Sequence, residues 1–278
     1  MTTTDIPSFF RVRQQFPRPR VEDAAGAVRR ELAALLDASP LAAGAQIGVT
    51  VGSRGIRGID TMVRAAVDLL KERGARPFVL PAMGSHGGAT ADAQSRLIAH
   101  YGVTSEAMGC PVRAEMDTRS LGQTPAGIEA RIAQVAWQSD GILLMNRIKP
   151  HTDYKGPIES GLTKICAIGL GKYDGAREIH RHLFTLGLGG AIRSVTEKLM
   201  ETGRIRGGLG ILENAYHETA RIVGVPARDL FATEERLLAE ARGLMGHLPV
   251  RDIDVLVCDR LGKNISGAGL DTNIIGRS

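Results

Sequence analysis

The chain has 278 residues, 43% hydrophobic and 23% charged, which is typical of a globular protein and long enough for one large domain or two ordinary ones. No apolar run approaches the roughly 18 residues of a membrane-spanning helix, and the N-terminal residues lack the apolar core of a signal peptide, so we expect no membrane partner. The net charge is +5, but the positive residues are dispersed among acids; this argues against a nucleic-acid surface and suits a basic pocket for a small anion equally well.

The cysteines indicate a reducing environment. Cys110, Cys166 and Cys258 lie far apart and form no CxxC pair. An odd, scattered set argues against a disulfide framework, and its spacing does not suggest an iron–sulfur cluster. We therefore expect a cytoplasmic protein.

The first hundred residues alternate helix and strand patterns. Apolar residues at helical spacing predict helices at 21–36, 59–73 and 91–101, and short apolar runs predict buried strands at 47–52 and 77–82. This alternation predicts an α/β fold, a mostly parallel sheet with flanking helices.

Both early strands lead into glycine-rich turns, GSRG and GSHGG. Ligands of parallel sheets bind at the carboxyl ends of the strands, so the topology predicts that Arg54 and His86 lie on the functional rim. Glycines on both sides of His86 allow a close approach to a ligand, although a histidine in a surface loop would fit the same pattern.

The rest of the main domain is less regular. A third buried strand is predicted at 141–149, and it ends in Lys149, Pro150 and His151. The other elements expected in this region are strands at 112–116, 208–212 and 220–225 and helices at 188–201 and 230–245.

The last 28 residues form a separate unit in this interpretation. IDVLVCD at 253–259 resembles the first strand of a new α/β unit, and no helix pattern follows it. We therefore divide the chain into a main domain at 1–250 and the strand and loop of a second, truncated α/β domain at 251–278.

The segment 146–180 carries the densest set of chemical groups. His151 follows a proline, and Lys164 lies among apolar neighbours, where it either extends its ammonium to solvent or becomes a desolvated nucleophile. GLGK at 169–172 precedes a helix and weakly resembles a phosphate cradle, although the P-loop spacing is not met. His180 and His182 are two residues apart on the same predicted helix, so they cannot both serve one site. Together with Arg54 and His86, these groups suit proton transfer on a small anionic substrate.

The motifs IGVTVGSRG, MGSHGG and 146–180 resemble those of the nickel-pincer lactate racemase family, over essentially the whole chain. The resemblance matches His86 and His151 to the two catalytic histidines and Arg54 to an arginine that contacts substrate. It matches Lys164 to the lysine that bonds covalently to the cofactor, and His180 to the nickel ligand.

This resemblance implies a racemase or epimerase that inverts the α-carbon of a 2-hydroxy acid by removing and returning a hydride. The cofactor would be a nickel-pincer nucleotide of the pyridinium-3,5-bisthiocarboxylic acid mononucleotide type. Its synthesis and insertion would need accessory proteins, and the resemblance leaves a homo-oligomer open.

One part of the family pattern differs. GAGLDTNIIGRS keeps Leu270, Asp271 and Asn273, but Gly276 stands where the family has a substrate-binding glutamine. With this departure, the resemblance implies a lactate-like or larger hydroxy acid as the substrate. A metal-independent epimerase or lyase that uses the histidine pair, and a non-catalytic ligand-binding homologue, are the alternatives.

Overall fold

The computed structural model describes residues 9–262, 265–266 and 268–276. Its centre is a five-stranded sheet in the order β2-β1-β5-β6-β7, in which β7 alone runs antiparallel to its neighbour. The strands of this sheet are β1 (Gln46–Val51), β2 (Arg76–Pro81), β5 (Gly141–Arg147), β6 (Ile205–Glu213) and β7 (Thr219–Pro226). The predicted fold class, α/β with a mostly parallel sheet and flanking helices, is confirmed.

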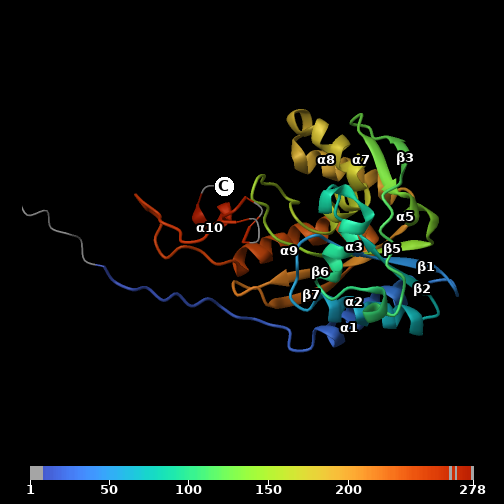
Figure 1. Ribbon diagram of the computed structural model, residues 1–278, viewed down its shortest axis with the longest axis horizontal. Coiled ribbons are helices and arrows are strands. Elements are labelled where there is room, and N and C mark those ends of the chain that lie inside the picture. The colour runs from blue at the N-terminus through green and yellow to red at the C-terminus, as the bar shows by residue number, and fades with distance from the viewer. Residues whose placement is uncertain (1–8, 263–264, 267, 277–278) are drawn as a thin grey trace, which may run out of the picture.

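Helices cover both faces of the sheet (Figure 1). On one face lie α1 (Ala24–Ala38) and α2 (Ile59–Glu72), and on the other lie α7 (Lys172–Arg181), α8 (Leu183–Met200) and α9 (Leu230–Leu244). Side chains alternate across a strand, so Leu143 and Leu144 of β5 belong to different cores, one on each face. Two aliphatic cores therefore fix the sheet from both sides.

Short elements complete the fold. They are the 3-10 turns η1 (Gly87–Ala89) and η3 (Ala227–Asp229), the helices α3 (Ala91–Ala99), α4 (Ser105–Met108), α5 (Gln134–Gln138), α6 (Leu162–Lys164) and α10 (Thr272–Ile275), the π-helical turn η2 (Ile165–Gly169), and the hairpin of β3 (Thr118–Gln123) and β4 (Glu129–Ala133). None of the helices in the described ranges is long and apolar enough to cross a membrane.

The strand predicted at 112–116 is wrong. Val112 forms a single bridge to Val79, and the chain then leaves the sheet edge. The extended pairing lies further on, in the β3–β4 hairpin, where the two strands pair with each other outside the main sheet. A hairpin with one exposed face has a weaker apolar pattern than a buried strand, so it was missed.

The strand predicted at 253–259 is also wrong. These residues form no strand, and Val255 and Val257 are 79% and 82% exposed. A strand needs a neighbour to bond its backbone groups, and no described strand pairs with this segment. The assignment of 251–278 to a second domain stays a prediction.

Candidate functional site

Three adjacent parallel strands end at the same edge of the sheet. The loop after β1 carries Ser53 and Arg54, the loop after β2 carries His86, and the loop after β5 carries His151. Ser53 Oγ lies 2.5 Å from His86 Nδ1, so the first two loops are hydrogen bonded to each other. Arg54 and His86 are exposed, and His151 is partly buried.

His151 and Lys164 are in direct contact, with Nε2 of His151 2.7 Å from Nζ of Lys164. Lys164 ends the short helix α6, which runs directly into the π-helical turn η2. The Tyr154 ring packs on the imidazole at a centroid distance of 4.5 Å. The second ring nitrogen of His151, Nδ1, accepts a hydrogen bond from the backbone N–H of Asp153 at 3.1 Å.

The environment disfavours positive charge on both members of this pair. Burial, followed by the charge of Lys164, lowers the pKa of His151 to about 4. Burial is also the main cause that lowers the pKa of Lys164 to about 8; the charge of Asp153 opposes this shift, and the charges of Arg54 and Lys149 add to it. His151 is therefore neutral at physiological pH. Lys164 is mainly protonated at that pH, with a minor fraction present as the neutral amine.

A buried carboxylate fixes the loop that carries His151. Glu159 is 1% exposed and accepts hydrogen bonds from the backbone N–H of His151 at 2.5 Å and of Gly156 at 3.1 Å. Arg242 of α9 donates to it at 2.7 Å and supplies the opposite charge. The pairing satisfies a carboxylate that would be costly to bury alone, so the loop is held in one conformation.

The His86 loop is fixed by a second buried network. Gln94 of α3 is fully buried and donates through Nε2 to the carbonyls of Gly84 at 2.9 Å and His86 at 3.0 Å. Its Oε1 accepts from Lys172 Nζ at 3.2 Å, and Lys172 also donates to the carbonyl of Pro81 at 2.8 Å. Lys172 is itself fully buried, and burial lowers its pKa to about 8.

This network corrects the interpretation of GLGK as a phosphate cradle. The ammonium of Lys172 points into the protein and donates to Pro81 and Gln94, so it is not presented to an anion. Lys172 also has a positive φ of 52°, which turns the chain at the start of α7 and directs the side chain inward.

His180 lies on α7, against the His86 loop. A Cβ built on Gly84 would lie 3.4 Å from Cβ of Ala176, so α7 packs closely on this loop. One turn later, His180 is exposed, and its Nδ1 lies 2.6 Å from the Ala176 carbonyl. A carbonyl can only accept, so Nδ1 carries the proton, and Nε2 is the nitrogen able to bind a metal.

Not all five predicted site residues touch. His151 and Lys164 are bonded to each other, whereas His180 makes its side-chain hydrogen bond to Ala176. In the described part of the chain, no three His, Cys, Asp or Glu side chains come together to hold a metal. A metal at His180 would need further ligands from a small molecule, which is consistent with a cofactor that brings its own donor atoms.

Several residues that shape this site were not predicted from the sequence: Gln94, Tyr154, Arg242, and Glu234, whose Oε2 accepts from the backbone N–H of Thr163 next to Lys164. A glutamine or glutamate at a buried position of a predicted helix is the signal that could have drawn attention to Gln94 and Glu234, since such residues are seldom buried without a partner. Nothing in the sequence shows which backbone groups they bind.

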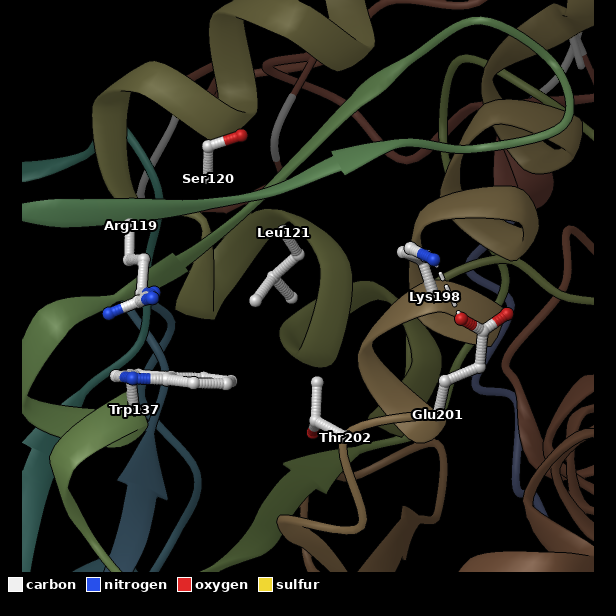
Figure 2. Close-up of a pocket in the computed structure, with 7 residues that line it drawn as sticks. All are labelled: Arg119, Ser120, Leu121, Trp137, Lys198, Glu201 and Thr202. Carbon is white, nitrogen blue, oxygen red and sulfur yellow. Dashed lines mark hydrogen bonds and ion pairs between the residues drawn. The ribbon is translucent and has the colours of Figure 1, made fainter.

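A separate cavity of about 340 Å³ lies at the opposite edge of the sheet (Figure 2). Trp137 precedes β5 and Thr202 precedes β6, so the cavity is at the amino ends of these strands. The guanidinium carbons of Arg119 and Arg204 lie 4.7 and 4.4 Å from the Trp137 ring centroid, and Lys198 is paired with Glu201 at 2.8 Å. Lys198 and Glu201 pair with each other and Arg119 stacks on Trp137, so we assign the cavity no chemistry.

Comparison with known proteins supports the fold. No family model matches the chain, and no curated protein sequence matches it. The structure is similar to that of the lactate racemase apoprotein from Thermoanaerobacterium thermosaccharolyticum, with a TM-score of 0.58 and 16% sequence identity. The similarity covers 85% of this chain and 59% of that one, so this chain spans about three-fifths of its length. At this identity the comparison shows a shared α/β fold of the lactate racemase type.

Proposed function

We propose that this chain is an α-hydroxy acid racemase or epimerase of the lactate racemase type that uses a nickel-pincer nucleotide. The observation that carries the proposal is the contact of His151 with Lys164. This pair lies at the sheet edge to which the neighbouring loops bring His86 and Arg54. The similarity of fold to a lactate racemase supports the same conclusion.

The residues fit a cofactor of this kind. Lys164 is a desolvated amine able to form a covalent bond to an acyl-type carbon, and it would tether the nucleotide. His180 offers Nε2, because its Nδ1 proton is held by the Ala176 carbonyl. When bound, the nickel-pincer nucleotide supplies the acceptor for a hydride from the substrate α-carbon.

The side chains of this chain would then handle the substrate's proton and charge. Inversion requires a base for the hydroxyl group on each side of the α-carbon, and His86 and His151 are the candidates. His151 is neutral at physiological pH and can therefore accept a proton. Arg54 would bind the substrate carboxylate. The substrate class that follows is a lactate-like or larger 2-hydroxy acid.

The covalent bond between Lys164 and the cofactor is the part of the proposal that can be tested most directly. The protein would be produced together with the cofactor-making enzymes, and its intact mass and nickel content would be measured. We expect one covalent adduct and one nickel per chain, loss of the adduct in Lys164→Ala, and loss of nickel in His180→Ala. Lys198→Ala is the matched control, because Lys198 is paired with Glu201 at the other edge of the sheet.

Three results would contradict the proposal. Full covalent loading of Lys164→Ala would remove the tether from this residue. Inversion of hydroxy acids that persists after nickel is removed would favour a metal-independent epimerase that uses the histidine pair. A loaded protein that binds hydroxy acids without inverting them would indicate a ligand-binding homologue.

A further inference from the structure

Both ring nitrogens of His151 are engaged by other groups of the chain. The backbone N–H of Asp153 donates to Nδ1 at 3.1 Å, and Nε2 lies 2.7 Å from Lys164 Nζ. The Tyr154 ring lies against the imidazole at a centroid distance of 4.5 Å. A histidine accepts a proton through the lone pair of a ring nitrogen, so His151 can act on a substrate only after one of the two nitrogen contacts opens.

The contact at Nδ1 is fixed by the loop itself. Glu159 accepts hydrogen bonds from the backbone N–H of His151 at 2.5 Å and of Gly156 at 3.1 Å, and these bonds set the path of the chain around Asp153. Tyr154 belongs to the same network, because its hydroxyl donates to the Glu159 carbonyl at 2.6 Å. The N–H of Asp153 therefore cannot leave Nδ1 unless the loop is disturbed.

The contact at Nε2 comes from a flexible side chain on another element. Lys164 lies at the end of α6, outside the His151 loop. Its ammonium sits on a four-carbon stem with several rotatable bonds, so Nζ can leave Nε2 while the imidazole stays in place. Of the two nitrogen contacts, the one with Lys164 is thus the one that can open in the folded protein.

Lys164 also weakens His151 as a base. Burial is the first cause that lowers the pKa of His151 to about 4, and the charge of Lys164 is the second. The charge of Lys149 adds to this shift, and those of Asp153 and Glu159 oppose it. Removing the positive charge from Nζ would therefore raise the basicity of His151 as well as open its nitrogen.

We propose that unmodified Lys164 keeps His151 inactive as a base, and that a covalent bond at Nζ activates it. An acylated Nζ carries no charge and has one N–H in place of three donors, so it loses the features that hold it on the imidazole. The inference rests on the proposed function for the group that Nζ receives and for the role of His151 as a base. The base would then be active only in a chain whose lysine carries the cofactor.

The test uses an acylated chain without any cofactor. Acetyl-lysine would be incorporated in place of Lys164, and the rate at which diethyl pyrocarbonate modifies His151 at neutral pH would be mapped by mass spectrometry. His217, whose side chain is 84% exposed, is the internal reference. We expect a rate at least about fivefold above wild type in the acetylated chain and in Lys164→Met, the effect of losing one hydrogen bond, and no change in Lys198→Met. An unchanged rate in the acetylated chain would overturn the proposal.

Two controls separate this effect from a disturbed fold. Cys166 is fully buried two residues after Lys164, so its thiol should stay unreactive toward iodoacetamide in every variant that keeps the local structure. Lys164→Arg retains the positive charge and the donors, and it should leave His151 as slow to react as in wild type. Equal acceleration in Lys164→Arg and Lys164→Met would contradict a role for the charged donor.

A pH titration of the unaltered protein gives a second readout. The imidazole C–H signal of His151, assigned by its loss in His151→Asn, is followed by NMR. We expect an inflection at about pH 4 from His151 itself and another at about pH 8, where Lys164 loses its charge. In the acetylated chain the second inflection should vanish, and the first should move up toward the ordinary value of 6.5. A wild-type signal that does not respond near pH 8 would overturn the proposal. Neither measurement involves nickel, nucleotide or racemase activity, so its failure is distinguishable from failure of the proposed function.

Discussion

Lys172 Nζ lies 3.2 Å from Gln94 Oε1, and this contact joins the first residue of α7 to α3, the helix that follows the His86 loop. The side-chain amide of Gln94 in turn donates a hydrogen bond to the His86 carbonyl at 3.0 Å. Since α7 also carries His180, the same buried pair sets the relation between two of the predicted site residues. Both side chains are fully buried, so they position the site through the elements that carry it.

Replacing this lysine should loosen the fold. Lys172→Met keeps most of the apolar volume but leaves the Pro81 carbonyl and Gln94 Oε1 without their donor. We expect the free energy of unfolding to fall by about 1–3 kcal/mol, the usual cost of leaving buried polar groups unpaired. Urea denaturation measures it. Lys198→Met, at a partly exposed position, should stay within about 0.5 kcal/mol of wild type, and equal stability of the two variants would contradict the argument.

The sequence was sufficient for the strands of the main sheet and for the edge at which the site forms. β1, β2 and β5 are short apolar runs, and the parallel topology alone puts Arg54, His86 and His151 at their carboxyl ends. Those predictions depend only on local pattern and on the rules of parallel sheets.

The contacts within the site depend on tertiary structure, and here the sequence was insufficient. GLGK weakly resembles a phosphate cradle, but the positive φ of Lys172 turns its side chain into the core. Lys164 could equally have reached solvent, and its contact with His151 arises because the segment between them folds back over Glu159. Periodicity carries no information about such returns of the chain.

The segment that contains α10 is docked on the His151 loop. Asn273 Nδ2 donates to the His151 carbonyl at 3.1 Å, and Thr272 Oγ1 donates to the Thr152 carbonyl at 2.7 Å. Asn273→Ala removes this hydrogen bond to the His151 loop, worth about 1 kcal/mol, together with the side-chain bonds of Asn273 to Asp271 and Lys155, and should raise amide exchange around Asp153 at least fivefold. Hydrogen exchange followed by mass spectrometry measures it, with the amides of β6 as the internal control. Unchanged exchange at the loop would show that this docking does not restrain it.

Glu234 provides the clearest pH test. This glutamate of α9 is fully buried, and its Oε2 accepts from the backbone N–H and hydroxyl of Thr163 at 2.8 and 3.0 Å. In the described part of the chain, its Oε1 has no hydrogen-bond partner. Burial raises the pKa of Glu234 to about 7, and the bonds from Thr163 oppose the shift only partly. Through its bonds to Thr163, Glu234 contacts α6, the short helix that ends at Lys164.

The sign of the pH effect follows from this shift. The folded state binds the proton more tightly than the unfolded state, whose pKa is near 4.5. The contribution to stability is therefore greatest below pH of about 4.5, falls as the pH rises, and is lost above about 7. Its upper limit is about 3 kcal/mol. Glu234→Gln cannot ionise, so relative to wild type it should gain up to this amount between pH 5 and pH 8. Urea unfolding at the two pH values measures it, and exposed Glu235→Gln should follow wild type. An equal pH dependence for Glu234→Gln and wild type would show that the buried carboxyl does not titrate in this range.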